Sequence, residues 1–362
     1  MKILAIDTSC DETSAAVVDG RRVLSNVIYS QVLLHKKWGG VVPSIAKRAH
    51  EERIDFVVDE ALKKSKFQIS NVKHSFDICH LDFDIKNSMS KIDYLAVTYG
   101  PGLAVALEVG IKKVKELSKK YNKKIIPVNH MEGHIYSCFT QNSKGNPKRE
   151  FTFPYLVLLV SGGHTEIVLW KDYLDFQIIG KTTDDAAGEA LDKAAKMLGL
   201  GYPGGPVIER LAEEAGNVDP YKFPRPMRKS GDLNFSFSGL KTAFYYFLQK
   251  MPEEEKNKMI KELVSSFQEA VFDSLLIKTE AAIKQIGIIN LVVAGGVAAN
   301  RELRKRMKNL AKKYKGSVVY PPYKYLNGDN AAMIGVAAFF KAKAGIFVKH
   351  IEAFDRIPRL SL

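Results

Sequence analysis

Short apolar runs and helix-spaced apolar positions follow one another in a definite order along the first part of the chain. The apolar run at residues 3–7 ends in a carboxylate, and residues 13–18 return as a second strand after a polar turn. Ser44 can cap a helix whose apolar positions keep helical spacing. Strands at 94–98 and 124–128 come next, separated by a Gly-Pro-Gly turn and a basic helix. This pattern predicts an α/β domain.

The same order of elements returns in the second part. Strands are predicted at 155–160, 165–170, 291–294 and 318–320, with a glycine turn and a basic helix between the last two. Only the order of elements repeats, not the residues. We therefore expect two similar α/β domains, with the strand-end loops of both facing a common cleft.

The expected domain limits follow from this repeat and from the length of 362 residues, which is long for one core. The first domain covers 1–150 and carries a polar surface insertion near 65–92. The second covers 151–340, with a helical insert at about 184–285, and the tail at about 340–362 packs back on the first domain. The insertion also holds a weaker alternative metal cluster, His74, Asp77, Cys79 and His80.

Charge and cysteine usage narrow the class of protein. Lys and Arg exceed Asp and Glu by 54 to 40, which gives a net charge of +14 and favours an acidic partner, nucleic acid first. Lysine enrichment from an AT-biased genome is the competing explanation. The cysteines Cys10, Cys79 and Cys138 form no CxxC pair. With a strand directly after Met1-Lys2 and no apolar run of membrane-spanning length, we expect a cytoplasmic protein without membrane association.

Two histidines four residues apart, His130 and His134, form the main candidate site. On a helix this spacing puts both imidazoles on one face, where they can bind one metal ion if a third ligand comes from elsewhere. The alternative is a pair of surface histidines without a metal. Asp329 occupies the counterpart position of the second half, so two histidines from one half and an aspartate from the other would form a three-ligand site with open positions.

Other polar and aromatic residues have structural explanations that compete with functional ones. Asp184 and Asp185 suit the N-terminus of a helix through its dipole. Asn300 suits a helix N-cap. Phe235 and Phe237 are better explained as core residues than as platforms for stacked bases.

Many motifs in order resemble the TsaD / YgjD / Gcp family, in the form typical of its bacterial branch. The motifs are Ile6–Ser14, Gly39–Pro43, Gly100–Leu103, Asn129–His134, Leu159–Thr165, Asp184–Asp192, Ser236–Thr242, Gly295–Asn300 and Asp329–Met333. Three stretches depart from the family pattern. The segment 65–92 is longer, Leu326-Asn327-Gly328 replaces a Cys-Thr-rich run before Asp329, and Ala104-Val105 and Glu108 are unusual after Gly-Pro-Gly.

The resemblance implies the actin-like, Hsp70-like, sugar-kinase-like (ASKHA) fold, with two RNase H-like domains facing a cleft. It implies transfer of threonylcarbamoyl from threonylcarbamoyl-AMP to the exocyclic amine of the adenosine beside the anticodon, in tRNAs that read codons beginning with adenine. By similarity, His130, His134 and Asp329 hold a divalent ion, iron(II) first and zinc second. The residues expected to bind the adenylate are Leu159, Val160, Ser161, Gly162, Gly163, Asp192, Gly205 and Asn300.

The resemblance also implies partners: threonylcarbamoyl-AMP, tRNA, a paralogous inactive subunit (TsaB-like) and a small ATPase (TsaE-like). No general base is assigned, and Asp11 and Glu12 are candidates only. Two other activities remain as alternatives, a small-molecule kinase of the same fold and a metalloprotease. The protease alternative is weak because Met131, not a glutamate, follows the first histidine.

Overall fold

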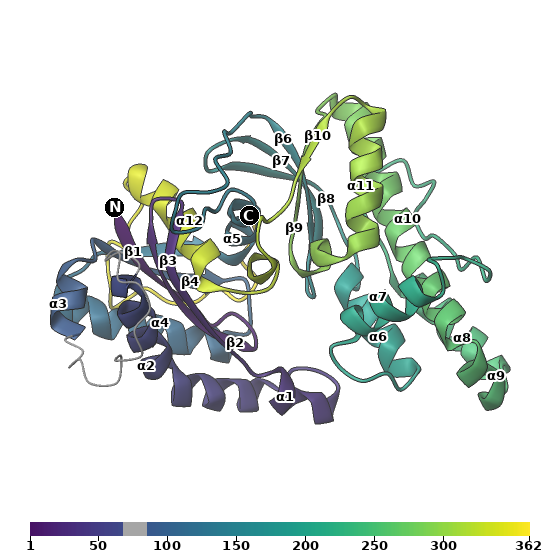
Figure 1. Ribbon diagram of the computed structural model, residues 1–362, viewed down its shortest axis with the longest axis horizontal. Coiled ribbons are helices and arrows are strands. Elements are labelled where there is room, and N and C mark those ends of the chain that lie inside the picture. The colour runs from purple at the N-terminus through teal and green to yellow at the C-terminus, as the bar shows by residue number, and fades with distance from the viewer. Residues whose placement is uncertain (68–84) are drawn as a thin grey trace. The chain divides into compact units, whose positions relative to one another are not determined.

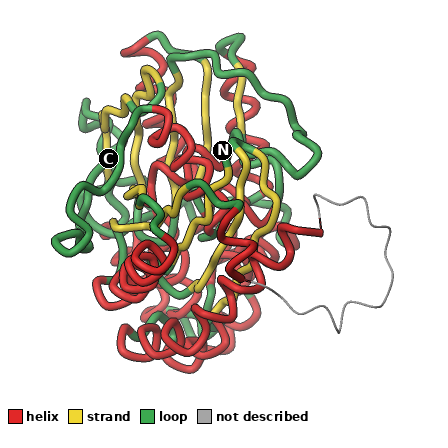
Figure 2. Tube along the Cα trace, turned by 90° about the vertical axis from the view of Figure 1, so that its left-hand side faces the viewer, coloured by secondary structure: helices red, strands yellow, loops and turns green. Residues whose placement is uncertain are grey.

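A computed structural model describes residues 1–67 and 85–362, which divide into two compact units. Unit 1 comprises Met1–Leu34, Val41–Glu150 and Pro321–Leu362, and unit 2 comprises His35–Gly40 and Phe151–Tyr320. Most of the proposed 65–92 insertion, with the alternative cluster of His74, Asp77, Cys79 and His80, lies outside the described residues. Figures 1 and 2 draw the helices and strands of both units.

Unit 1 contains a five-stranded sheet in the order β3-β2-β1-β4-β5. β2 is antiparallel to β1 and β3, whereas β4 and β5 are parallel to β1. Its elements are β1 (Lys2–Asp7), β2 (Glu12–Asp19), β3 (Arg22–Ser30), α2 (Pro43–Phe67), α3 (Ile85–Ser90), β4 (Tyr94–Gly100), α4 (Ala104–Tyr121), β5 (Ile125–Asn129), α5 (His130–Ser137), η4 (Lys324–Leu326) and α12 (Ala331–Lys343). The short helix α1 (Val32–His35) ends where the chain passes into unit 2.

Unit 2 contains a second five-stranded sheet, in the order β10-β9-β6-β7-β8. Read from β8, its strand order and directions repeat those of unit 1, which confirms the repeated order of elements. Its elements are η1 (Lys36–Trp38), β6 (Tyr155–Val160), β7 (Thr165–Asp172), β8 (Asp175–Lys181), α6 (Ala187–Met197), α7 (Gly204–Glu214), α8 (Ser238–Lys250), α9 (Glu253–Lys258), α10 (Ile260–Ile286), β9 (Asn290–Ala294), η3 (Gly296–Ala299), α11 (Arg301–Lys313) and β10 (Ser317–Val319).

The chain returns to unit 1 earlier than the sequence suggests, at Pro321 instead of near residue 340. The cause is α12, which is apolar on all sides and therefore has to be covered by other elements. It packs against β1, β2, β5 and α5. At Gly335 the contact is close enough that an added Cβ would lie 2.9 Å from the side chain of Val18.

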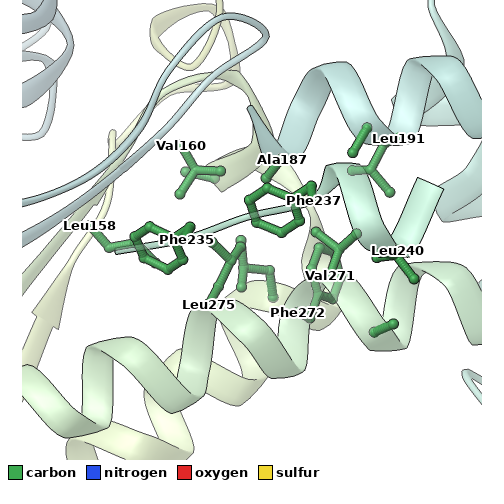
Figure 3. Close-up of a cluster of buried hydrophobic side chains, with 14 of the residues drawn as sticks. Leu158, Val160, Ala187, Leu191, Phe235, Phe237, Leu240, Val271, Phe272 and Leu275 are labelled. Carbon is green, nitrogen blue, oxygen red and sulfur yellow. The ribbon is translucent and has the colours of Figure 1, made fainter. Parts of the chain in front are cut away.

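Each unit has its own apolar core. In unit 1, α2 packs against β2 and β3 and α4 packs against β1 and β4, and the shared core includes Leu4, Val57 and Val114. In unit 2, the sheet packs against the helical insert, and Figure 3 shows Phe235 and Phe237 inside this cluster. Both rings are almost fully buried, so they are core residues and not platforms for stacked bases. In the described part of the chain, no helix has the length and apolar character needed to cross a membrane.

Candidate metal centre

The two histidines lie on α5, directly after β5, an edge strand of the unit 1 sheet. β5 ends at Asn129, whose side-chain oxygen accepts a hydrogen bond of 2.8 Å from the Met131 N–H and so caps the helix. His130 and His134 are both buried, and their ring centroids lie 4.7 Å apart. The cap therefore begins the helix at the residue that carries the first imidazole.

Asp329 reaches the histidines from the segment before α12. Asn330 caps α12 by accepting a hydrogen bond from the Met333 N–H at 3.1 Å. α12 in turn packs against α5, where an added Cβ on Gly133 would lie 2.8 Å from Ile334. Since α5 and α12 belong to the same unit, the aspartate does not come from the other half of the molecule, as the repeat suggests.

The three side chains converge on one point. Oδ1 of Asp329 lies 3.3 Å from Nε2 of His130 and 3.3 Å from Nε2 of His134, and all the candidate ligand atoms lie within 4.8 Å of one another. Ligands held about 2.1 Å from one tetrahedral ion lie roughly 3.4 Å apart. The spacing of the three groups therefore fits a shared metal ion.

The surroundings of the two imidazole rings support this fit, because ring nitrogens of both histidines are buried without a hydrogen-bond partner. Both ring nitrogens of His134 are buried without a hydrogen-bond partner, a costly arrangement that a bound cation would relieve at Nε2. On the far side of His130, Nδ1 lies 3.6 Å from Oδ2 of the buried Asp7, which closes β1. A carboxylate behind a ligating imidazole fixes the ring orientation and raises its basicity.

When no metal is bound, the pKa values of the three side chains depend on one another. Burial disfavours the charged form of His130, but the carboxylates of Asp329 and Asp7 outweigh burial and raise the pKa of His130 to about 10. Burial lowers the pKa of His134, against the opposing effect of Asp329. For Asp329, burial alone would raise the pKa, but the two histidines hold it well below its usual range. A metal ion and a proton therefore compete for the same nitrogen.

The two candidates for a general base lie nearby in unit 1. Asp11 is buried, and its Oδ2 has no hydrogen-bond partner. Glu12 opens β2 and accepts a hydrogen bond from the Ser30 hydroxyl at 3.2 Å. Burial, together with the charges of Asp329 and Asp11, raises the pKa of Glu12 well above its usual value.

The expected adenylate residues all belong to unit 2, and the first group forms the turn between β6 and β7. Leu159 and Val160 are buried strand residues at the end of β6. The turn is closed by hydrogen bonds from Ser161 N–H to the His164 carbonyl and from His164 N–H to the Ser161 hydroxyl. Gly162 and Gly163 are exposed, and an added Cβ at either would meet nothing within 4 Å. Their backbone is therefore open to a ligand.

The remaining adenylate candidates cap helices. Oδ1 of Asp192 accepts hydrogen bonds from the N–H groups of Gly204 and Gly205, at 2.8 and 3.1 Å, and so caps α7. Asn300 caps α11 through its Oδ1, and its Nδ2 donates to Gln268 at 3.0 Å. One of the two Nδ2 hydrogens of Asn300 is left for another acceptor.

Asp184 does not stabilise the start of its own helix, as the sequence suggests, because α6 begins only at Ala187. It caps α8 instead, and accepts hydrogen bonds from the Phe237 and Ser238 N–H groups at 2.8 and 3.2 Å. Despite the opposing effect of partial burial, these and the bonds from nearby serine hydroxyls hold the pKa of Asp184 below its usual value. The motifs around residues 184 and 236 are therefore joined in space.

Two features of this region escaped the sequence reasoning. Asp7 is predicted only as the end of a strand, although a carboxylate that closes a strand of the same parallel set as β5 is a usable signal. Glu132, between the two histidines, pairs with Lys341 of α12 at 3.0 Å. This ion pair gives Glu132 a structural role. The metalloprotease alternative is then left without a glutamate that could activate water.

The architecture and the cluster together define a class: a two-unit α/β protein of the ASKHA fold with a candidate His-His-Asp metal centre. A structure of HypF from T. kodakarensis shares the fold with a TM-score of 0.56 and 11% identity, over 97% of this chain and 48% of its own. A second HypF structure, in a phosphate- and nucleotide-bound form, gives a TM-score of 0.56 and 13% identity, over 95% of this chain and 46% of its own.

Sequence comparison defines the family. The model of the TsaD family, tRNA N6-adenosine threonylcarbamoyltransferase, matches residues 22–74 and 83–336. The protein so named from Kosmotoga olearia is 47% identical over 362 residues, which cover 100% of this chain and 99% of the relative. The one from Thermosipho africanus is 44% identical, with 100% of both chains covered. This chain belongs to the TsaD family of tRNA N6-adenosine threonylcarbamoyltransferases, a family that implies a divalent metal.

Proposed function

We propose that this chain transfers the threonylcarbamoyl group from threonylcarbamoyl-AMP to the exocyclic amine of the adenosine beside the anticodon, in tRNAs that read codons beginning with adenine. Family membership supports the reaction class. The observation that carries the proposal is the convergence of His130, His134 and Asp329 within 4.8 Å, in a chain of that family.

The three residues would hold one divalent ion, iron(II) first and zinc second. When bound, such an ion supplies a Lewis acid that polarises an acyl oxygen. Asp7, 3.6 Å from His130 Nδ1, orients the first imidazole. Because AMP is a good leaving group, the chain needs no nucleophile of its own. Asp11 and Glu12 are the candidates to accept the proton that the amine loses.

Unit 2 would bind the adenylate. The exposed backbone at Gly162 and Gly163 offers N–H groups to the phosphate in a nest, since no Cβ stands in the way. Asp192 accepts the Gly205 N–H at the N-terminus of α7, and its carboxylate can accept a further hydrogen bond from a ribose hydroxyl. The remaining Nδ2 hydrogen of Asn300 can reach an acceptor on the ligand.

The proposal includes partners and location. We propose a TsaB-like paralogous subunit and a TsaE-like ATPase as partners, a separate enzyme as the source of the adenylate, and the cytoplasm as the site of action. The net charge of +14 supports direct contact with tRNA. The family match favours neither the kinase nor the protease alternative.

The test uses His130→Ala with His350→Ala as the matched control. His350 is an exposed histidine of the same unit and lies outside the cluster. We expect His130→Ala to lose bound metal in elemental analysis and to lose transfer to tRNA, with an unchanged circular dichroism spectrum. His350→Ala should keep both properties. If His130→Ala keeps its metal and its activity, the assignment of the site is wrong.

A further inference from the structure

A groove beside the metal cluster has an aromatic wall that the proposed chemistry does not yet use. It is a shallow groove, open to solvent, with a volume of about 650 Å³, and it is lined by Glu12, Ile28, Tyr323, Lys324, Tyr325 and Asp329, together with one glycine. All of these residues belong to unit 1. The volume lies within the range of about 300–1,000 Å³ that is usual for ligand sites.

The aromatic wall consists of two nearly parallel tyrosine rings, from the residues directly before and after Lys324 in the sequence. The ring planes of Tyr323 and Tyr325 differ by 6°, and their centroids lie 5.9 Å apart. Tyr323 is fixed, because its hydroxyl donates a hydrogen bond of 2.8 Å to the Asn146 carbonyl. Tyr325 leaves 39% of its surface exposed. One ring therefore supports the other, and the outer ring is available to a flat ligand.

The groove also has an apolar wall and groups of both charges. Ile28 of β3 is 38% exposed and gives the groove its apolar wall. Lys324 is exposed and has no carboxylate within 4.0 Å in the described part of the chain. Glu12 offers a carboxylate to a donor such as an exocyclic amine. Aromatic stacking, a free cation and an acceptor together suit a nucleotide of single-stranded RNA.

The position of the groove indicates which nucleotide it binds. Asp329 lines the groove and also lies 3.3 Å from Nε2 of both His130 and His134. A base stacked in the groove would therefore lie against a candidate metal ligand, where the acyl group has to arrive. We propose that this groove binds the acceptor adenosine of tRNA, with its base stacked on Tyr325 and its backbone phosphate near Lys324. This inference rests on the proposed function, because that function names the acceptor.

The binding test uses an anticodon stem-loop RNA with 2-aminopurine at the acceptor position, and the full-length, metal-loaded chain. Stacking on a tyrosine quenches 2-aminopurine fluorescence. We expect quenching with the native chain and with Tyr325→Phe, which keeps the ring, and a loss of quenching with Tyr325→Ala. Tyr173→Ala, at a tyrosine of unit 2 that is 45% exposed, serves as the control and should behave as the native chain does.

The kinetic test measures KM separately for tRNA and for threonylcarbamoyl-AMP. Loss of one base–aromatic stack should raise KM for tRNA about 5- to 100-fold in Tyr325→Ala and leave KM for the adenylate unchanged. Equal quenching in Tyr325→Ala and the native chain overturns the proposal, and so does a rise in KM for the adenylate alone, which would place the donor in the groove. If quenching depends on Tyr325 but the chain transfers no threonylcarbamoyl group, the result would support base binding in the groove and refute the proposed function.

Discussion

Replacement of Gly188 by alanine tests how the turn between β6 and β7, which we propose binds the adenylate phosphate, is held in place. Gly188 lies in the first turn of α6, and an added Cβ would lie 2.5 Å from the Ser161 carbonyl oxygen and 2.9 Å from the Gly162 Cα. Both are main-chain atoms and cannot rotate away. To reach an ordinary contact of 3.4 Å, the turn would have to move by about 0.9 Å relative to the helix.

The expected cost follows from two opposing effects. Overpacking of this kind destabilises by about 1–3 kcal/mol. Alanine in a helix gains about 0.5–1 kcal/mol over glycine, so with both effects near the middle of their ranges Gly188→Ala should lose about 1–2 kcal/mol of stability. For a unit of this size, the corresponding fall in Tm is about 2–8 °C.

Thermal unfolding and titration calorimetry with the adenylate would measure the two consequences. Gly188→Ala should lower both Tm and adenylate affinity, since the turn moves. Gly162→Ala is the control, because its Cβ meets no atom within 4 Å. It should leave Tm unchanged and reduce affinity only if the phosphate touches the turn. An unchanged Tm and affinity in Gly188→Ala would refute the contact as described.

Three further predictions concern the ligand, the tRNA and pH. Asp192→Ala should weaken adenylate binding in calorimetry much more than Asp11→Ala does, and a larger effect of Asp11→Ala would place the phosphate in unit 1. Log affinity for tRNA should fall linearly with log salt concentration, and a flat dependence would assign tRNA binding to partner subunits. Glu280 accepts hydrogen bonds from Lys313 and Tyr314 at 2.7 Å each, and these lower the pKa of Glu280 to about 2. Because the folded-state pKa is depressed, Glu280→Gln should lower the free energy of unfolding at pH 7 by less than about 1 kcal/mol, seen as a small fall in Tm. The difference in Tm from the native chain should shrink as pH falls from 4.5 toward 2.

Periodicity was sufficient to predict most of the two sheets, because their strands are short apolar runs with clear ends. The third strands were harder to predict. β3 and β8 have mixed burial, with exposed positions such as Ile28 and Asp175 within them, so they lack the continuous apolar run of β1 and β6. α4 begins at Ala104, before its basic part at Lys112, because its first turns carry the apolar face.

The residues of the metal cluster could be named from the sequence, but their placement could not. Helical spacing brings His130 and His134 together. The position of Asp329 beside the histidines depends on the return of α12 to unit 1. That return brings together segments far apart in the sequence, and burial of the apolar helix drives it. Asp184 shows the same limit: whether a carboxylate caps its own helix or another depends on a contact 53 residues away in sequence.

The central claim is the transfer of threonylcarbamoyl to tRNA, and mass spectrometry of tRNA nucleosides tests it most directly. The full-length chain, loaded with metal and supplied with the proposed partner subunits, is incubated with threonylcarbamoyl-AMP and a tRNA that reads a codon beginning with adenine. We predict a nucleoside whose mass equals adenosine plus one threonylcarbamoyl group, absent when guanosine replaces the adenosine beside the anticodon. Unmodified adenosine after complete incubation, in the presence of intact adenylate, would contradict the account.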